Sequence, residues 1–156
     1  MRILVCSDSH QEVKKFRQII EMKQAKANCL AFLGDGAYDL ERVRPQGMEV
    51  HAVAGNCDGS YSGNPVTDVF TVGGKRIFMC HGFGRFAVKM CGISLLQEEA
   101  SVSRADIVLF GHTHEPLHIY EDGVYFFNPG AVCDGKYGFI DITSAGIVCV
   151  HHALPW

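Results

Sequence analysis

The chain has 156 residues, with 14 Lys and Arg against 17 Asp and Glu and a formal net charge of −3. At 47% hydrophobic and 20% charged residues it can bury a substantial core, which argues against intrinsic disorder and against a disulfide-dependent scaffold. The charge shows no basic excess of the kind that proteins binding nucleic-acid polymers or anionic membranes carry. We therefore expect one globular domain over residues 1–156.

The N-terminus and the cysteines bear on the cellular compartment. The opening segment MRILVCSDSH reaches polar residues too soon for a signal peptide, and no apolar run approaches the roughly 18 residues of a membrane span. The seven cysteines form no C-x-x-C pair and stand mostly within apolar runs, as buried reduced thiols do. These patterns predict a cytoplasmic protein without a membrane partner.

The first part of the chain alternates predicted strands with a helix. Residues 2–6 form a β-rich run, and two further apolar strands lie within residues 29–36 and 49–59. Ser9 and Glu12 fit an S-x-x-E capping box at the start of the helix that follows the first strand. The apolar residues that share one face of this helix are Val13, Phe16, Ile19 and Ile20.

The rest of the chain is dominated by predicted hairpins. A turn-rich stretch covers residues 60–65. The segments predicted after it are a hairpin over 68–82 turning at Gly73-Gly74, a helix over 94–103, an apolar strand within 105–114, a hairpin over 118–130 turning at Asp122-Gly123, and a hairpin over 136–152 turning near 144–146. This order indicates an α/β layered domain with a mixed sheet or two stacked sheets.

Polar residues stand at the ends of five predicted strands. They are Asp8, His10, Asp35, Asn56-Cys57-Asp58, His81 and His112-Thr113-His114. Loops beyond the carboxyl ends of strands in α/β sheets converge on one crevice. Imidazole, carboxylate and amide ligands suit borderline and hard divalent cations. Any one of these residues alone would fit a turn or a half-buried structural role, but the ordered set favours a metal site.

This ordered set resembles the calcineurin-like metallophosphoesterase superfamily, and within it the small phosphodiesterases of the YfcE type. The family pattern is D-x-H, G-D, G-N-[HC]-[DE], H-G and G-H-x-H followed by N-P-G, and this chain matches it from Asp8 to about Ala131. The resemblance implies a single metallophosphoesterase domain over residues 1–156. It also implies an α/β fold, a four-layer αββα sandwich of two mixed β-sheets flanked by helices.

The resemblance further implies a dinuclear metal site. The first divalent ion would be held by Asp8, His10, Asp35 and His114, and the second by Asp35, Asn56, His81 and His112. Asp35 would bridge the pair, since two cations about 3.5–4 Å apart need a shared anionic ligand. Relatives indicate Mn²⁺, while the N/O ligation also suits Fe²⁺, Co²⁺, Ni²⁺ or Zn²⁺.

The implied function is that of a metal-dependent phosphodiesterase, a phosphoric ester hydrolase. It would cleave small aryl or nucleotide phosphodiesters through in-line attack by a metal-bridging hydroxide. The catalytic candidates are Asn56, Cys57 and Asp58, with Asn56 also contacting substrate. Many relatives have His where this chain has Cys57, so either this thiol or water would protonate the leaving group. We therefore expect diesters with acidic leaving groups to react faster than alkyl monoesters.

Two departures from the family pattern concern residues outside the ligand set. Phe83 replaces a second His after H-G, and Ala131 replaces the Ser that often follows N-P-G. Arg85 is a candidate substrate contact. Phe83, Phe86 and Tyr38 could stack on a substrate, but packing in the core is the expectation for these aromatic side chains, and solvation is the expectation for Arg85.

Two other interpretations of the sequence compete with the enzyme. Residues 82–87 fit G-x-G-x-x-A, but the preceding strand is predicted as a hairpin arm, which disfavours a dinucleotide site. The serious alternative is a non-catalytic protein-interaction scaffold on the same fold, as in the retromer subunit that resembles these phosphodiesterases. The complete ligand set favours the enzyme. The expected partners are a small phosphodiester and, as among relatives, a second copy in a homo-oligomer, but no nucleic-acid polymer.

Overall fold

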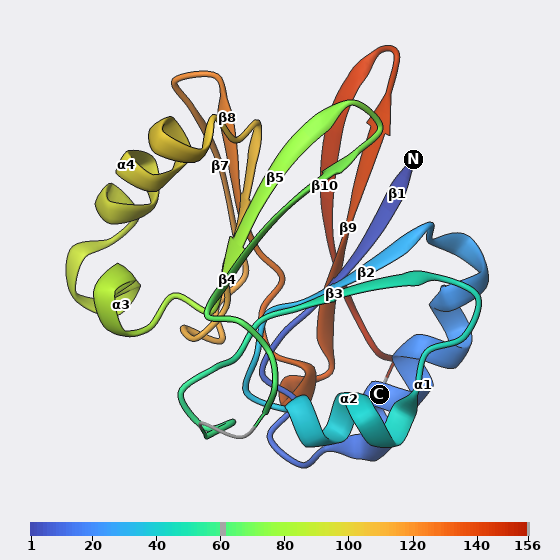
Figure 1. The fold of residues 1–156 in the computed structure, drawn as a ribbon. Helices are drawn as coiled ribbons and strands as arrows, with labels where there is room; N and C mark the ends of the chain where they lie inside the picture. The colour runs from blue at the N-terminus through green and yellow to red at the C-terminus, as the bar shows by residue number, and fades with distance from the viewer. Residues whose placement is uncertain (60–61, 156) are drawn as a thin grey trace.

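The computed structural model describes residues 1–59 and 62–155, so the turn-rich prediction at 60–65 falls outside the described residues at Ser60 and Tyr61. Two five-stranded sheets pack face to face, and helices cover the outer face of each sheet (Figure 1). Each sheet mixes parallel and antiparallel pairs. The predicted four-layer αββα sandwich is confirmed.

The first sheet, called sheet A, has the strand order β10-β9-β1-β2-β3. Its strands are β1 (Arg2–Cys6), β2 (Cys29–Phe32), β3 (Glu49–Ala52), β9 (Lys136–Thr143) and β10 (Gly146–Ala153). The first three are parallel, and β9 pairs antiparallel with both β1 and β10. The helices beside this sheet are α1 (Val13–Lys23) and α2 (Ala37–Val43), with η1 (Gln24–Lys26) and η3 (Val132–Asp134) as short 3₁₀ turns.

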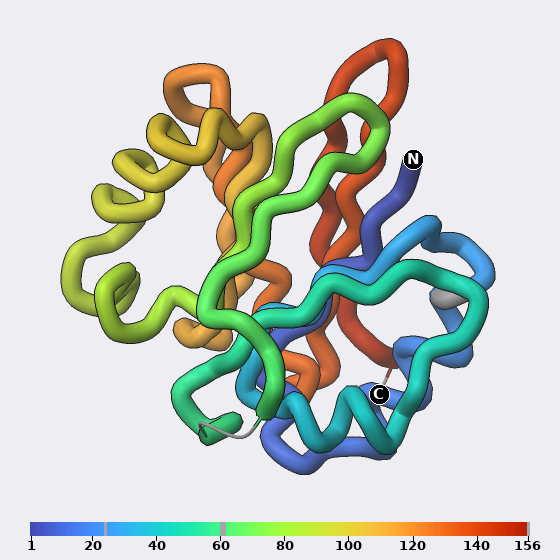
Figure 2. Tube along the Cα trace, viewed as in Figure 1, coloured from blue at the N-terminus to red at the C-terminus, as the bar shows by residue number. Residues whose placement is uncertain are grey.

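The second sheet, sheet B, has the order β4-β5-β6-β8-β7. Its strands are β4 (Thr67–Val72), β5 (Lys75–Cys80), β6 (Ile107–Leu109), β7 (Leu117–Glu121) and β8 (Val124–Asn128). Its outer face is covered by α3 (Val88–Cys91) and α4 (Ser94–Ser103), which follow η2 (Gly84–Phe86). The three predicted hairpins are present, and the turns of β4–β5 and β9–β10 lie at one end of the molecule (Figure 2).

The alternation of side chains along the strands divides the core into three layers. In β1, Ile3 and Val5 face sheet B, whereas Leu4 and Cys6 face α1. A third apolar layer joins sheet B to α4 through residues such as Phe78. Because both faces of each central strand are buried, these strands are continuous apolar runs, and polar side chains begin only where the strands end.

Some local predictions were wrong. The first helix begins at Val13, and the Ser9 hydroxyl donates to the Asp39 carboxylate, so Ser9 and Glu12 do not form the predicted capping box. The apolar pattern does not single out α2, which has only seven residues. Of the cysteines predicted to be buried thiols, Cys91 is exposed, and Cys133 and Cys149 are half-buried.

Four histidines belong to no motif: His51, His118, His151 and His152 are half-buried or exposed. The longest helix in the described part of the chain, α1, has 11 residues, so none of the described helices could cross a membrane.

Candidate metal centre

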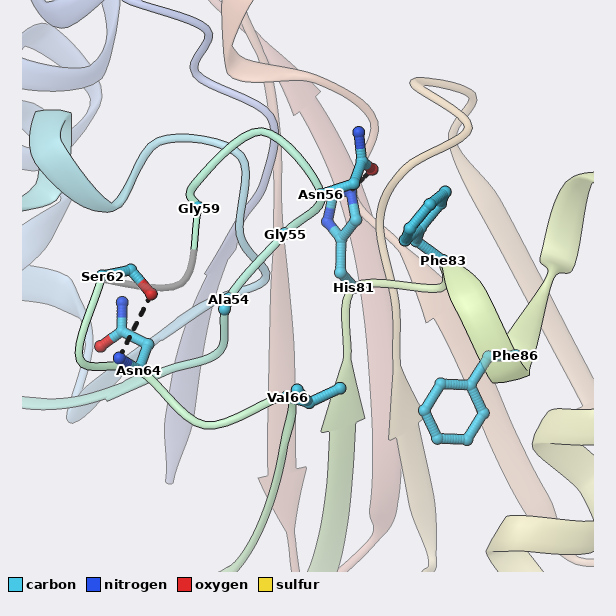
Figure 3. A pocket seen from close by; sticks show the side chains of 10 residues that line it. All are labelled: Ala54, Gly55, Asn56, Gly59, Ser62, Asn64, Val66, His81, Phe83 and Phe86. Atoms are coloured by element: carbon cyan, nitrogen blue, oxygen red, sulfur yellow. Dashed lines mark hydrogen bonds between the residues drawn. The ribbon is translucent and has the colours of Figure 1, made fainter.

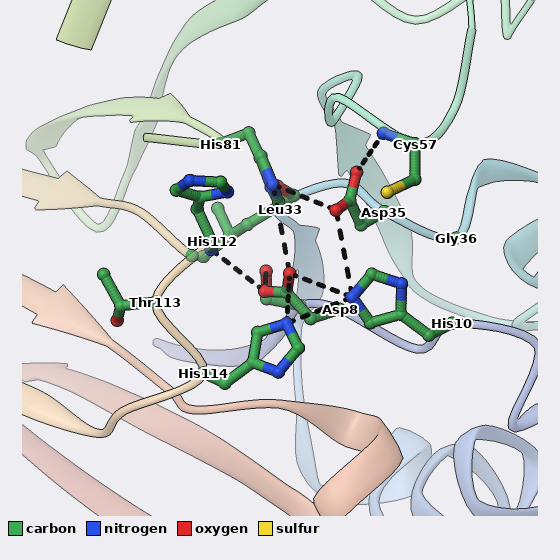
Figure 4. Close-up of polar contacts among 12 residues, drawn as sticks. Asp8, His10, Leu33, Asp35, Gly36, Cys57, His81, His112, Thr113 and His114 are labelled. Carbon is green, nitrogen blue, oxygen red and sulfur yellow. Dashed lines mark hydrogen bonds and ion pairs between the residues drawn. The ribbon is translucent and has the colours of Figure 1, made fainter. Parts of the chain in front are cut away.

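Five loops meet at one end of the two sheets. Sheet A contributes the loops after β1, β2 and β3, and sheet B contributes the loops after β5 and β6. The side chains that these loops bring together are Asp8, His10, Asp35, Asn56, Cys57, His81, His112 and His114. Figure 4 labels Asp8, His10, Asp35, Cys57, His81, His112 and His114 around a common centre. The predicted convergence on one crevice is therefore present.

Asp8 is fully buried at the centre of this cluster. Its Oδ2 accepts hydrogen bonds from the Ser7 hydroxyl and from the backbone N–H of His112. Its Oδ1 makes no hydrogen bond with the described residues, yet it lies 3.2 Å from Nε2 of His114 and 3.6 Å from Nε2 of His10. A buried carboxylate oxygen facing imidazole nitrogens needs a positive partner, which a divalent cation would provide.

Asp35 is the second buried carboxylate. Its Oδ1 accepts the backbone N–H of Cys57 at 2.7 Å, and its Oδ2 lies 3.3 Å from Nε2 of His81 and 3.8 Å from Nε2 of His10. The other ring nitrogen of His81 is 2.7 Å from the carbonyl oxygen of Leu33. This contact fixes the ring so that Nε2 points into the cluster, as the outer hydrogen bonds of metal-ligating histidines do.

The donor atoms form overlapping groups, in each of which all atoms lie within 4.8 Å of one another. The groups are Asp8 with His10 and His114, Asp8 with Asp35 and His81, and His10 with Asp35 and Cys57. The oxygen and imidazole donors fit divalent ions of the expected class. The third group adds a thiol that the sequence interpretation treated only as a proton donor.

Two of the expected ligands lie at the margin of these groups. The Asn56 Oδ1 is 3.1 Å from Nε2 of His81, and the His112 ring centroid is 5.1 Å from that of His81. Both side chains therefore stand beside the expected second metal position, on the side of the cluster that His81 occupies.

Backbone conformation at the cluster is unusual. The non-glycine residues with left-handed φ angles there are Asp8 (55°), His10 (44°), Asp35 (57°), His112 (67°) and His114 (63°). Each such residue costs roughly 1–2 kcal/mol relative to the right-handed region. Strain of this kind persists where the surrounding structure enforces it and concentrates at functional sites.

Two glycines leave room for the carboxylates. A Cβ atom at Gly55 would lie 2.1 Å from Asp35 Oδ1, and one at Gly111 would lie 2.8 Å from Asp8 Oδ2. Both positions therefore exclude every residue with a side chain. This close approach explains why glycine precedes Asn56 and His112 in the motifs.

Asp58 holds two loops of sheet A together. Its carboxylate accepts four backbone N–H groups, from Asp35, Gly36, Ala37 and Gly55, at 2.7–2.8 Å. These bonds fix the position of the Asp35 backbone against the loop after β3. The geometry supports a positioning role for Asp58, whereas the sequence interpretation grouped it with the catalytic residues.

Asn128, in the N-P-G motif, fixes a loop of sheet B. It is fully buried, and its Nδ2 donates to the carbonyl oxygen of Gly111 and to the Thr113 hydroxyl at 2.9 and 3.0 Å. The loop that carries His112 and His114 is thereby fixed to β8. Asn128 stood in a recognised motif, but only the contacts reveal its role.

Burial and nearby charges shift several pKa values. Burial opposes ionisation of Asp35, but hydrogen bonds from His81 and Cys57 outweigh it and hold the pKa of Asp35 well below its usual range. Burial also opposes a charged His81, yet Asp35 and Asp8 raise its pKa. Burial and the nearby charge of His81 lower the pKa of His112, which favours the neutral imidazole. Burial and Asp35 raise the pKa of the Cys57 thiol.

The remaining candidate substrate contacts, which are aromatic or basic, lie in different environments. Phe86 is buried as predicted, but Phe83 is 54% exposed and Tyr38 is 68% exposed, so the expectation of core packing was wrong for both. The Arg85 guanidinium pairs with Glu99 and lies over the ring of Phe86. Arg85 is therefore exposed to solvent as expected, and these contacts give no support to its candidacy as a substrate contact.

A cleft of about 400 Å³ opens beside His81 (Figure 3). Its lining includes Asn56 and Phe83, so it adjoins the metal-ligand cluster. A second cleft of about 280 Å³ opens beside His10 and Cys57, on the other side of the loop after β3. Among the described residues, the two clefts have no lining residue in common.

The calcineurin-like phosphoesterase superfamily domain matches residues 1–148 of the chain. The chain therefore belongs to this family of metal-dependent phosphoesterases, and the resemblance inferred from the motifs is confirmed. It is 24% identical to Phosphodiesterase YfcE of Escherichia coli (strain K12), with 97% of this chain and 93% of that protein aligned.

Solved structures give the same fold. A predicted phosphoesterase from Streptococcus pneumoniae TIGR4 superposes with a TM-score of 0.81 at 25% identity, covering 97% of this chain and 88% of that one. Wild-type Vps29 from Entamoeba histolytica, solved as a complex with Zn²⁺, gives a TM-score of 0.74 at 19% identity, covering 98% and 99%. The second likeness shows the fold alone.

Proposed function

We propose that this chain is a phosphodiesterase that hydrolyses small aryl or nucleotide phosphodiesters at the cluster around Asp8 and Asp35. One observation carries the proposal: the buried Asp8 Oδ1 makes no hydrogen bond within the described residues and lies 3.2–3.9 Å from Nε2 of three histidines. Such an arrangement is typical of a cation-binding site. Because the chain belongs to a phosphoesterase family, a cation at this position would serve phosphoester hydrolysis.

The group of Asp8, His10 and His114 supports the first predicted ligand set, and the position of Asn56 and His112 beside His81 supports the second. Asp8, His10 and His114 would hold one divalent ion together with Asp35, and the other would be held by Asp35, Asn56, His81 and His112. Divalent ions bound there would neutralise phosphate oxygens and acidify the attacking water. Mn²⁺ is the proposed metal, with Fe²⁺, Co²⁺, Ni²⁺ and Zn²⁺ as alternatives that the same donors accept.

The loop after β3 supplies the residues proposed to orient the substrate and protonate the leaving group. Asn56 is exposed at the cluster, and its amide would orient a phosphate oxygen of the substrate. The Asn56 Nδ2 also donates to the Cys57 sulfur at 3.3 Å, and the exposed thiol would protonate the leaving group. Asp58 would position both residues through its four backbone contacts. A thiol is a modest acid, so esters with acidic leaving groups should react fastest.

The proposed reaction is tested by hydrolysis of bis(p-nitrophenyl) phosphate after removal of metal with a chelator and reloading with Mn²⁺. We expect activity only after reloading, with a preference for this diester over p-nitrophenyl phosphate. A series of aryl diesters should show rates that rise as the leaving-group pKa falls. Equal rates for monoester and diester, or rates independent of the leaving group, would contradict the proposal.

The alternative is a non-catalytic scaffold, and the structural likeness to Vps29 keeps it in consideration. Every expected ligand position is occupied by a suitable residue, which favours the enzyme. A protein that binds no divalent ion in elemental analysis, and stays inactive with each metal tried, would establish the scaffold. We also propose that the chain acts as a single cytoplasmic domain, since its cysteines are free, as in reducing compartments.

A further inference from the structure

We propose that Phe83 is a stacking platform that selects substrates with a planar aromatic ester group, an aryl ring or a nucleobase, in the cleft beside His81. This inference rests on the proposed phosphodiesterase function and deepens it. It assigns a binding role to one residue at which this chain departs from the family pattern.

The first argument is the position of the Phe83 ring. Its centroid is 5.4 Å from that of His112, and the ring stands beside His81 and Asn56 at the edge of the cleft (Figure 3). A phosphate held at the cluster would therefore carry its ester group toward this ring. With 54% of its surface exposed, the ring has a face available for another aromatic group.

The second argument is that the backbone fixes the ring at this edge. Phe83 is extended between Gly82 (φ 96°) and Gly84 (φ 67°), two conformations that favour glycine. The carbonyl oxygen of Gly82 accepts the backbone N–H of Val88, and the buried Phe86 anchors the following turn. A ring presented by an anchored turn loses little conformational freedom when a ligand binds.

The third argument is the chemistry of the cleft. Its volume of about 400 Å³ suits a small organic group, since ligand pockets span roughly 300–1,000 Å³. Apolar side chains of Val66 and Phe86 line it together with the amide of Asn64. Among its described lining residues there is no Asp, Glu, Lys or Arg. The cleft therefore favours an uncharged ring with hydrogen-bonding edges over a second phosphate.

The test compares ligands that share a phosphorus oxyanion and differ in the group attached to it. Phenylphosphonate and methylphosphonate contain no phosphoester bond, so the protein cannot hydrolyse them as esters. Their binding to the Mn²⁺-loaded protein can be measured by calorimetry. Adenosine 5′-monophosphate distinguishes a nucleobase from a simple aryl ring, and inorganic phosphate probes the anion site alone. We expect the wild-type protein to bind phenylphosphonate or the nucleotide about 10-fold more tightly than methylphosphonate, as stacking predicts.

Substitutions assign the preference to Phe83. F83A should remove the preference and leave the affinity for inorganic phosphate unchanged, whereas F83Y should retain it. Tyr38→Ala is the matched control, because it removes an exposed aromatic side chain from the other cleft. Thermal melting confirms that each variant is folded.

Three results would overturn the inference. The first is a ring preference that survives in F83A, and the second is an equal loss of the preference in Tyr38→Ala. The third is a wild-type protein that binds inorganic phosphate but shows no preference for a ring. A loaded wild-type protein that binds no phosphate at all would instead remove the proposed function, and this inference with it.

Discussion

The two sheets contribute different chemistry to the same cluster. The loops of sheet A supply both buried carboxylates, Asp8 and Asp35, whereas the loops of sheet B supply His81, His112 and His114. Negative charge thus comes from one half of the sandwich and most of the imidazoles come from the other. Neither sheet alone forms the cluster, so the centre depends on the apolar layer that packs the sheets together.

The difference indicates how each half should respond to substitution. A buried carboxylate contributes charge that no neighbouring group replaces, whereas a lost imidazole leaves the charge of the site intact. Substitution of the carboxylates in the sheet A loops should therefore be more damaging than substitution of the imidazoles in the sheet B loops. Three predictions test this asymmetry, and a fourth concerns the pH dependence of the sheet B histidines.

The largest effect is expected from Asp35→Asn. The proposed bridging ligand loses its charge, so activity on bis(p-nitrophenyl) phosphate should fall about 10³-fold and should not recover with excess Mn²⁺. The control is Asp141→Asn, which removes a carboxylate paired with Arg2 far along sheet A. Steady-state kinetics at several Mn²⁺ concentrations measure both variants. If the activity of Asp35→Asn recovers at high Mn²⁺, the carboxylates of sheet A and the imidazoles of sheet B contribute equally to the site.

A smaller effect is expected from His114→Ala in sheet B. Loss of one neutral ligand should weaken Mn²⁺ binding by about 10²-fold, while the carboxylates still attract the ion. Activity should therefore return as Mn²⁺ is raised, and a metal titration of the initial rate measures this. If the activity of His114→Ala does not recover at saturating Mn²⁺, loss of this imidazole is as damaging as loss of the Asp35 charge.

The positioning residues extend the comparison to stability. Asp58→Ala leaves four backbone N–H groups without their acceptor and should lower the free energy of unfolding by about 3 kcal/mol. Asn128→Ala removes two donated bonds and the bond that Oδ1 accepts from the Gly130 N–H, and should cost about 2 kcal/mol. Urea denaturation of the metal-free proteins gives both values. A larger cost for Asn128→Ala would reverse the expected order of the two sheets.

The smallest effect concerns pH. The raised pKa of His81 means that a proton competes with the metal below that pKa, whereas His112, with its lowered pKa, is already neutral. Mn²⁺ affinity should therefore rise with pH, by up to about tenfold per pH unit below the pKa of His81, and level off above it. Calorimetry in buffers of different ionisation enthalpy counts the protons released. Affinity that stays constant from pH 6 to pH 8 would contradict this account.

Much of this arrangement could be predicted from the sequence, because continuous apolar strands end sharply in polar residues. The hairpins turning at Gly73-Gly74 and Asp122-Gly123 follow from local turn chemistry, and the helix over 94–103 has the predicted bounds. The convergence of the cluster follows from strand ends meeting in one crevice. Local patterns of this kind specify elements well.

What could not be predicted depends on contacts between distant residues. Asp58 follows Cys57 in the motif, yet its bonds to residues 35–37 fix its role. Ser9 bonds to Asp39, thirty residues away, which no capping pattern could indicate. Phe83 has an apolar side chain of the kind that usually packs in a core. Only its place on an anchored turn beside the cluster shows that it is exposed.

The number of Mn²⁺ ions bound per chain tests the central claim most directly, because the claim is that both sheets build one centre for two ions. Equilibrium dialysis with elemental analysis should give two ions per wild-type chain, and fewer for Asp35→Asn. The Asp141→Asn control should match the wild type. A wild-type chain that binds no Mn²⁺ and no other divalent ion, or an Asp35→Asn chain that still binds two with unchanged affinity, would contradict the account.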